Sequence, residues 1–193
     1  MNRGPYVQTL TGRHWYFTEP RPEDVCFDDL RALSRVTRYG GHTADGVELY
    51  SVMEHSVRVA RLLASWGAPR EVQLAGLLHD GGEAYPPGDQ LGPFVRWLEK
   101  TDPVNSVLLI RGYAQIAVNL RFGVHETLTG PLAWTVAAAD RVLLATERRD
   151  LCEESAVDWG PMPDALPERI EPWTQARASG EFQRLFRSLG GEP

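Results

Sequence analysis

Four side chains of the types that bind metal ions stand beside apolar segments: His55, the adjacent pair His79 and Asp80, and Asp140. His79 and Asp80 follow the apolar run Leu-Ala-Gly-Leu-Leu, and Asp140 follows three alanines. Burying an imidazole or a carboxylate is costly unless it has a partner, and one divalent cation would satisfy all four. Two imidazoles and two carboxylates suit first-row metals. We therefore predict a divalent metal cofactor, drawn from Co²⁺, Mn²⁺, Zn²⁺, Fe²⁺ and Mg²⁺.

Each of these residues has a simpler interpretation when it is taken alone. His79 could be a core histidine with ordinary hydrogen-bond partners, Asp80 could end a helix, and Asp140 could form a solvated pair with its neighbouring arginine. The four together favour a metal site. A closed tetrahedral site would be structural, whereas a site with open positions would be catalytic, and the residues leave both open.

The spacing of apolar residues predicts a mainly helical chain. We expect a short β-hairpin, an acidic proline-rich loop over 153–174, and helices over 24–36, 49–66, 70–84, 91–100, 104–122, 131–152 and 178–188. The predicted fold is an all-α helical bundle with a short N-terminal β-hairpin. We expect a single domain over 1–193, made of the hairpin (6–18), a helical core with the site (24–152), and the proline-rich loop and C-terminal helix (153–193). The metal ligands would then come from facing helices, as in other bundle cores.

Composition limits the partners that we expect. The chain has 193 residues, of which 42% are hydrophobic, and a formal net charge of −6. That charge argues against nonspecific binding to nucleic acid. No apolar run approaches the roughly 18 residues that span a bilayer, and no apolar signal segment is found, so we predict a cytoplasmic protein without membrane contact. The two distant cysteines, Cys26 and Cys152, are expected to be reduced.

Several motifs occur in the order found in one known family. They include Arg-Tyr-Gly-Gly-His-Thr, Tyr-Ser-Val-Met-Glu-His-Ser, Leu-Leu-His-Asp-Gly-Gly-Glu-Ala-Tyr and Ala-Asp-Arg-Val-Leu-Leu-Ala-Thr-Glu-Arg-Arg-Asp-Leu. Over about residues 6–152 the sequence resembles HD-domain phosphohydrolases, and within them the small phage dATP triphosphohydrolases and bacterial 5′-deoxynucleotidases. The resemblance implies an HD-domain helical bundle, a homo-oligomer, and a bacterial source or a phage with a bacterial host.

The resemblance also implies roles for the acidic and histidine residues. Glu83 matches a catalytic residue that orients the attacking water or protonates the leaving oxygen, although it could also be an exposed helix glutamate. On a helix it would lie one turn after His79. Asp89, in a Gly-Asp pair, matches a residue near the sugar or the water. The metal ligands that the resemblance implies are His55, His79, Asp80 and Asp140.

Four further residues match positions that bind substrate. Arg38 matches an arginine that holds phosphate. Tyr39 stands where a bulkier residue fills the place of a ribose 2′-hydroxyl, and its own hydroxyl could instead bond that group. His42 could touch phosphate or have a structural role, which we favour. Arg96 stands where a basic residue often follows the Gly-Asp pair.

The predicted activity is hydrolysis of a 2′-deoxynucleotide at its α-phosphate. We favour a dNTP triphosphohydrolase acting on a purine such as dATP, because the connection over 56–78 is short and because Arg35, Arg58 and Arg61 could serve extra phosphates. The first alternative is a 5′-deoxynucleotidase that releases phosphate from dNMPs. The second is an HD-type phosphodiesterase or an inactive nucleotide-binding regulator. A metal-free helical adaptor is a remote third.

The sequence lacks three motifs of other nucleotide-binding or hydrolytic proteins: the GxxxxGK[ST] loop, the GxSxG elbow and the GxGxxG fingerprint. No such motif therefore favours a different activity. The helix expected over 104–122 is apolar on more than one face. Part of it could contact a second subunit, or all of it could pack in the core.

Overall fold

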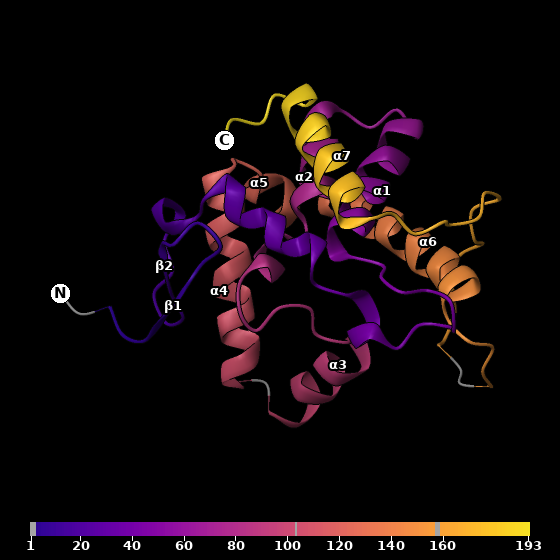
Figure 1. The fold of residues 1–193 in the computed structure, drawn as a ribbon, viewed down its shortest axis with the longest axis horizontal. Coiled ribbons are helices and arrows are strands. Elements are labelled where there is room, and N and C mark those ends of the chain that lie inside the picture. Colours follow the sequence, from indigo (N-terminus) through magenta and orange to yellow (C-terminus); the bar gives the residue numbers. More distant parts are fainter. Residues whose placement is uncertain (1–2, 103, 157–158) are drawn as a thin grey trace.

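The computed structural model describes residues 3–102, 104–156 and 159–193. Helix α1 (Val52–Ser65) lies at its centre. Helices α2 (Arg70–Leu78), α6 (Ala133–Leu151) and α7 (Gln175–Ser188) pack around it (Figure 1). Ten of its residues are buried, as expected for a helix covered on most sides. Its start is set by Ser51, whose hydroxyl accepts a hydrogen bond from the Glu54 N–H at 3.2 Å.

The remaining elements confirm the predicted all-α class with an N-terminal hairpin. Strands β1 (Tyr6–Gln8) and β2 (His14–Tyr16) pair antiparallel, with Val7 opposite Trp15. Helices α3 (Gly92–Thr101) and α4 (Ser106–Arg121) lie where the sequence predicts them. The short helix α5 (His125–Thr129) was not predicted. The described part of 153–174 contains no helix or strand, and residues 157–158 of that predicted loop lie outside the described residues.

The helix expected over 24–36 is instead formed by two 3₁₀ helices, η1 (Pro22–Asp24) and η2 (Phe27–Ser34). Phe27, Leu30 and Leu33 recur at every third position and are all buried. A 3₁₀ helix has three residues per turn, so this spacing places all three on one side. The predicted α-helix was therefore wrong in type, although the buried face was predicted.

The helix expected over 70–84 ends early, because α2 stops at Leu78. Asp80 has φ −106° and ψ 18°, and a separate 3₁₀ helix, η4 (Gly81–Ala84), follows it. Neighbouring residues on one α-helix point about 100° apart. The break frees His79 and Asp80 from that restriction.

Helix α4 explains where this break occurs. A Cβ atom added at Gly81 would lie 2.7 Å from Val118 Cγ1, and one added at Gly82 would lie 2.6 Å from the Gln115 backbone N. Only glycine permits so close an approach. The Gln115 side chain accepts a hydrogen bond from the Gly82 N–H at 2.8 Å and donates one to the Leu78 carbonyl at 3.0 Å. It thereby satisfies backbone groups that the end of α2 leaves free.

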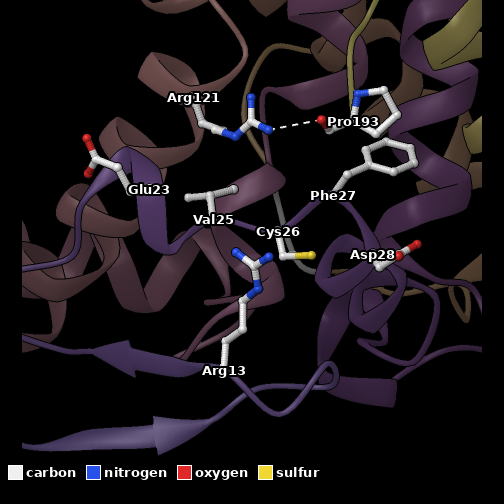
Figure 2. Close-up of a pocket in the computed structure, with 8 residues that line it drawn as sticks. All are labelled: Arg13, Glu23, Val25, Cys26, Phe27, Asp28, Arg121 and Pro193. Carbon is white, nitrogen blue, oxygen red and sulfur yellow. Dashed lines mark hydrogen bonds between the residues drawn. The ribbon is translucent and has the colours of Figure 1, made fainter.

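The hairpin packs against the segment after this break. The Trp15 ring stacks on Tyr85 at 3.7 Å between centroids, in a second apolar cluster with Val118 of α4. A pocket of about 370 Å³ has Val25 of this cluster in its lining (Figure 2). Arg121 at the edge of this pocket donates a hydrogen bond to the carbonyl of Pro193 at 3.0 Å, which holds the C-terminal end against α4.

Other surface features test parts of the sequence interpretation. Among the described residues, no helix is both long and apolar enough to cross a membrane. Cys26 and Cys152 are free, as predicted.

Helix α4 buries Ala114, Ala117 and Val118 and exposes an opposite apolar row, Leu109, Tyr113, Ile116 and Leu120. Apolar residues on more than one face are thus confirmed, and the homo-oligomer stays a prediction.

Asp150, in the last turn of α6, fixes the segment that leads to α7. Its carboxylate accepts hydrogen bonds from the Ile170 N–H at 2.9 Å and from Arg149 Nε at 2.7 Å, and Arg169 contacts it at 3.1 Å. Burial alone raises the pKa of Asp150. The hydrogen bonds from Arg149 and Ile170 outweigh burial, so the pKa lies below its usual value.

We expect the substitution Asp150→Asn to lower the free energy of unfolding by about 1.5–3 kcal/mol at pH 7, because a charged acceptor of several hydrogen bonds is lost. A depressed folded-state pKa stabilises the fold above the unfolded pKa of about 3.9 and loses that effect as the pH falls through the folded value. The deficit should thus be constant above pH 5 and shrink below about pH 4. Urea unfolding at several pH values measures it. Glu154→Gln, at an exposed site, is the control, and a deficit that grows in acid would contradict the assignment.

Candidate metal centre

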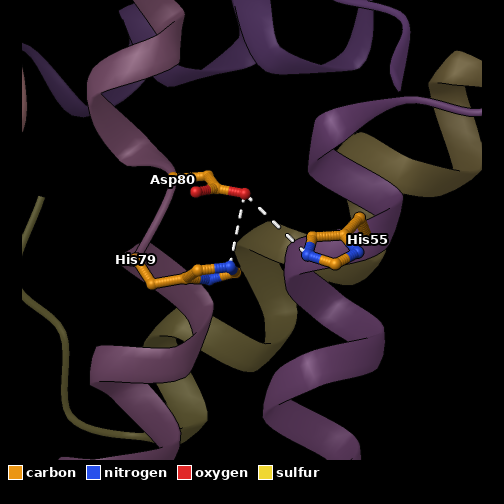
Figure 3. A group of neighbouring side chains, drawn as sticks. All are labelled: His55, His79 and Asp80. Atoms are coloured by element: carbon orange, nitrogen blue, oxygen red, sulfur yellow. Dashed lines mark ion pairs between the residues drawn. The ribbon is translucent and has the colours of Figure 1, made fainter. Parts of the chain in front are cut away.

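The four predicted metal ligands come together from three parts of the fold. His55 projects from α1, His79 and Asp80 lie at the break after α2, and Asp140 projects from α6. Figure 3 shows His55, His79 and Asp80 pointing toward one another. Asp140 Oδ1 lies 3.0 Å from His55 Nε2 and 3.9 Å from His79 Nε2. Asp80 Oδ2 lies 3.8 Å and 3.2 Å from the same two nitrogens. His55, His79 and Asp80 form a group that could hold a metal ion.

The histidine tautomers fit a metal site. His79 Nδ1 lies 2.7 Å from the Gly76 carbonyl, which can only accept, so this nitrogen carries the proton. His55 Nδ1 lies 2.5 Å from the Glu147 carboxylate. Both Nε2 atoms are buried and, within the described residues, neither has a hydrogen bond of acceptable geometry. A histidine that ligates a metal through one nitrogen and donates from the other has this arrangement.

The spacing of the ligand atoms also fits. Metal bonds to nitrogen and oxygen are about 2.0–2.2 Å long, so neighbouring ligand atoms around one cation lie roughly 3.0–3.6 Å apart. The measured separations of 3.0–3.9 Å are close to that range. Burial lowers the pKa of His79, but Asp80 and Asp140 outweigh it and raise the pKa to about 9. The two carboxylates thus make the site favourable for positive charge.

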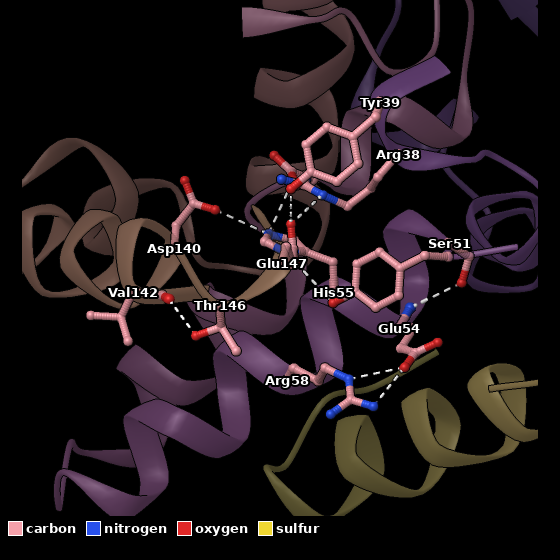
Figure 4. Close-up of polar contacts among 12 residues, drawn as sticks. Arg38, Tyr39, Ser51, Glu54, His55, Arg58, Asp140, Val142, Thr146 and Glu147 are labelled. Carbon is pink, nitrogen blue, oxygen red and sulfur yellow. Dashed lines mark hydrogen bonds and ion pairs between the residues drawn. The ribbon is translucent and has the colours of Figure 1, made fainter. Parts of the chain in front are cut away.

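Sequence reasoning missed Glu147, which is fully buried on α6 (Figure 4). Its carboxylate accepts hydrogen bonds from Arg38 Nε at 3.2 Å, the Tyr39 hydroxyl at 2.5 Å and the Tyr50 hydroxyl at 2.9 Å, and it contacts His55 Nδ1 at 2.5 Å. We call these five residues the Glu147 network. Burial raises the pKa of Glu147, but the positive charge of Arg38 and the contacts with His55 outweigh it and hold the pKa near 2.

The sequence contained a signal for Glu147. It follows Asp140 by seven residues, which is two turns along the same face of a helix. A carboxylate on the same face as a metal ligand, in a mostly apolar helix, is a candidate partner for a second ligand. Glu147 lies within the motif Ala-Asp-Arg-Val-Leu-Leu-Ala-Thr-Glu-Arg-Arg-Asp-Leu. Only the tertiary structure brings Arg38, Tyr39 and Tyr50 to it.

Tyr39 has a left-handed backbone, with φ 59° and ψ 17°. That conformation costs a residue other than glycine about 1–3 kcal/mol and persists where surrounding contacts hold it. The hydroxyl bond to Glu147 is such a contact. Because the Tyr39 hydroxyl already donates its proton to Glu147, it offers other groups only a lone pair.

We call His55, His79, Asp80 and Asp140 the metal cluster. Glu83 lies beside it, but on η4 instead of on a continuous helix with His79. The expectation of a single helix there was wrong, because the chain breaks at Asp80. Glu83 is 6% exposed, and its Oε2 is buried with no hydrogen-bond partner among the residues that the structure describes. Burial, together with the charges of Asp80 and Asp89, raises the pKa of Glu83 to about 9. Burial and Asp80 also raise the pKa of the half-buried Asp89, so these carboxylates share one region.

Comparison with known proteins agrees with this geometry. The HD domain family matches residues 52–143, a range that includes all four predicted ligands. An uncharacterized protein of Rhodobacter capsulatus is 31% identical over 205 residues, covering 96% of this chain and 98% of its own. The uncharacterized protein YfdR of Escherichia coli is 27% identical over 195 residues, covering 95% of each.

The chain contains an HD domain over residues 52–143. HD domains bind divalent metal ions, and the family indicates a metal-dependent phosphohydrolase. The matched range is shorter than the predicted single domain, so the boundaries of that domain stay a prediction.

Not every residue predicted for the substrate lies at the HD-domain site. Arg38 and Tyr39 do, through the Glu147 network, and Arg38 Nη1 also lies 3.5 Å from Asp80 Oδ2. His42 is exposed at the end of the turn Arg38–Gly41 (η3), and Arg96 is exposed on α3. In the described part of the chain, no hydrogen bond or ion pair joins either one to the metal cluster.

The three arginines considered for extra phosphates face elsewhere. Arg58 bonds Glu54 within α1, and Arg61 bonds Glu181 of α7. Arg35 is exposed and lines a separate pocket beside the hairpin. Within the described residues no contact joins these three arginines to the candidate metal ligands, so the structure does not support the suggestion that they serve a triphosphate.

We expect Glu147→Gln to weaken divalent metal binding by about 10- to 100-fold, the usual effect of removing a partner that orients a metal-binding histidine. A glutamine presents one acceptor and one donor group to donors that all need an acceptor. Calorimetric titration with Mn²⁺ or Zn²⁺ measures the affinity, and circular dichroism checks the fold. Glu153→Gln, at an exposed site just after α6, is the matched control. Unchanged affinity in a folded Glu147→Gln protein would contradict the role.

Proposed function

We propose that this protein hydrolyses 2′-deoxynucleotides at the α-phosphate with a divalent metal ion, acting as a dNTP triphosphohydrolase on a dATP-like purine. The observation that carries the proposal is a pair of buried histidine Nε2 atoms facing two aspartates, next to the buried Glu83 Oε2. Over the described ranges, none of these three atoms has a hydrogen-bond partner. The motif resemblance supports the nucleotide as the substrate class.

His55, His79, Asp80 and Asp140 would hold the cation. When bound, it polarises the phosphoryl oxygen and lowers the pKa of water toward neutrality. The buried location of His55 and the fixed Nδ1 contacts of both histidines keep the ligand geometry rigid. Such preorganisation is what an electrostatic catalyst requires.

Glu83 would act as the general acid. Burial and the charges of Asp80 and Asp89 raise its pKa to about 9, which favours the protonated acid. Protonated Glu83 would donate its proton to the leaving O5′ as water attacks phosphorus and the P–O5′ bond breaks. The products from a dNTP are the deoxynucleoside and triphosphate. After giving up its proton, the carboxylate can accept the next one from water.

Arg38 would hold the phosphate. Its guanidinium donates from Nε to Glu147 and approaches Asp80 through Nη1, which orients the remaining N–H donors beside the metal ligands. A planar guanidinium suits phosphate oxygens. Tyr39, adjacent in the Glu147 network, is the residue that we propose faces the sugar.

A 5′-deoxynucleotidase is the second candidate. It differs from a triphosphohydrolase only in whether the site has space and positive charge for the β- and γ-phosphates. The pairing of Arg58 and Arg61 with glutamates favours it, because these arginines leave a triphosphate without the charge that the sequence interpretation gave it.

The decisive assay measures hydrolysis of each dNTP, each dNMP and the matching ribonucleotides with Mn²⁺, Co²⁺ or Mg²⁺. Phosphate and triphosphate are quantified separately. Metal-dependent triphosphate release from a dNTP supports the proposal, whereas phosphate from dNMPs alone supports the second candidate. No turnover of any nucleotide by metal-loaded protein would overturn both and favour an HD-type phosphodiesterase or a nucleotide-binding regulator.

We expect Glu83→Gln to lower kcat by about 10²- to 10⁴-fold while metal affinity stays close to that of the wild type, because the amide cannot transfer a proton. Asp80→Ala should lose both metal and activity. Metal titration and steady-state kinetics on the two variants distinguish these effects. A Glu83→Gln enzyme with wild-type kcat would remove Glu83 from the mechanism.

A further inference from the structure

Arg111 projects from the second turn of α4 toward Glu83. Its Nη2 lies 3.8 Å from Glu83 Oε1, which is beyond hydrogen-bond distance. Its side chain is 40% exposed, and its Nε is buried with no hydrogen-bond partner among the described residues. The guanidinium thus faces the candidate site with donors that the protein does not satisfy.

Arg38 and Arg111 act on the same carboxylates. Both lower the pKa of Glu83 and of Asp89, although burial raises each more strongly. The two arginines differ in their own contacts. Arg38 pairs with Glu147 and approaches the predicted metal ligand Asp80, whereas the described part of the chain pairs Arg111 only with Glu83 among these carboxylates.

This difference assigns the two arginines to different phosphates. A phosphate that is attacked must lie at the metal ligands, where Arg38 lies. Among the described residues Arg111 contacts the site at Glu83 and not at the metal ligands themselves, and its half-exposed side chain can extend toward solvent. Guanidinium groups with free donors bind phosphate oxygens as a fork. Further phosphates on the substrate would supply the acceptors that Arg111 lacks.

We propose that Arg111 binds the phosphates that are not hydrolysed, the β- and γ-phosphates of a nucleoside triphosphate, and so determines the choice of triphosphate over monophosphate. This inference rests on the proposed function, because it takes the α-phosphate to lie at the metal ligands. Arg111 provides the charge that Arg58 and Arg61 do not.

The test compares Arg111→Ala with the wild type on dATP and dAMP. We expect kcat/KM for dATP to fall about 10- to 100-fold, mainly through KM, as for loss of a charged hydrogen bond. The value for dAMP should fall much less, because dAMP has no β- or γ-phosphate for Arg111 to bind. Arg111→Lys, which keeps the charge without the fork, should be intermediate. Arg187→Ala, which removes an exposed charge on α7, is the matched control.

Two results would overturn the inference. One is an unchanged KM for dATP. The other is an equal fall for both nucleotides with a shifted pH profile of kcat, which would mean that Arg111 only sets the pKa of Glu83.

Binding separates this inference from the proposed function. Calorimetry of dATP and dAMP is carried out on Glu83→Gln and on Glu83→Gln/Arg111→Ala, both loaded with Mn²⁺. Selective loss of dATP affinity in the double variant supports the inference even if the wild type hydrolyses neither nucleotide, a result that would overturn the proposed hydrolase alone. Equal affinities of the two variants for dATP would overturn the inference while leaving hydrolysis by the wild type intact.

Discussion

The buried charge of Glu147 is the constraint on which the candidate site depends. A carboxylate in the protein interior is very costly unless it is paired and hydrogen-bonded, and this one gathers Arg38, Tyr39, Tyr50 and His55. One of those partners, His55, is a predicted metal ligand, and another, Arg38, is the proposed phosphate-binding residue. Satisfying one side chain therefore fixes the positions of groups from two other segments of the chain, 38–39 and 50–55. It also holds Tyr39 in its left-handed conformation, so backbone strain is stored next to the site.

The opposite side of the site depends on a close contact between backbones. Gly81 and Gly82 let α4 approach the end of α2, and Gln115 satisfies the backbone groups that the approach leaves free. The resulting break lets two consecutive side chains, His79 and Asp80, face one point. The same approach brings α4, and Arg111 with it, toward Glu83. Ligand geometry and the charge around Glu83 thus have a common structural origin.

The charged groups around the metal cluster are of two kinds: some are held in place by other side chains, and others have atoms that could still bind a substrate. Asp80, Asp140 and the two histidines form a compact set of donors, and Glu147 keeps His55 and Arg38 in place. Glu83 and Arg111 each have one buried polar atom with no hydrogen-bond partner in the described part of the chain. Such atoms destabilise a fold and are common at functional sites. The division matches a site where one part is rigid and the other meets a substrate.

The sequence by itself determined the helical class, the N-terminal hairpin and most helix positions, and it singled out the four side chains that come together at the candidate metal site. Apolar periodicity and the residue types that can bind metal are local properties. Only the tertiary structure decided the break at Asp80, the 3₁₀ form of 27–34, the partners of Glu147 and the directions of Arg58 and Arg61. These features depend on which segments meet, such as α4 against two glycines. The energy of a buried charge or of a close backbone contact is set by neighbours far away in the chain, and no local pattern records them.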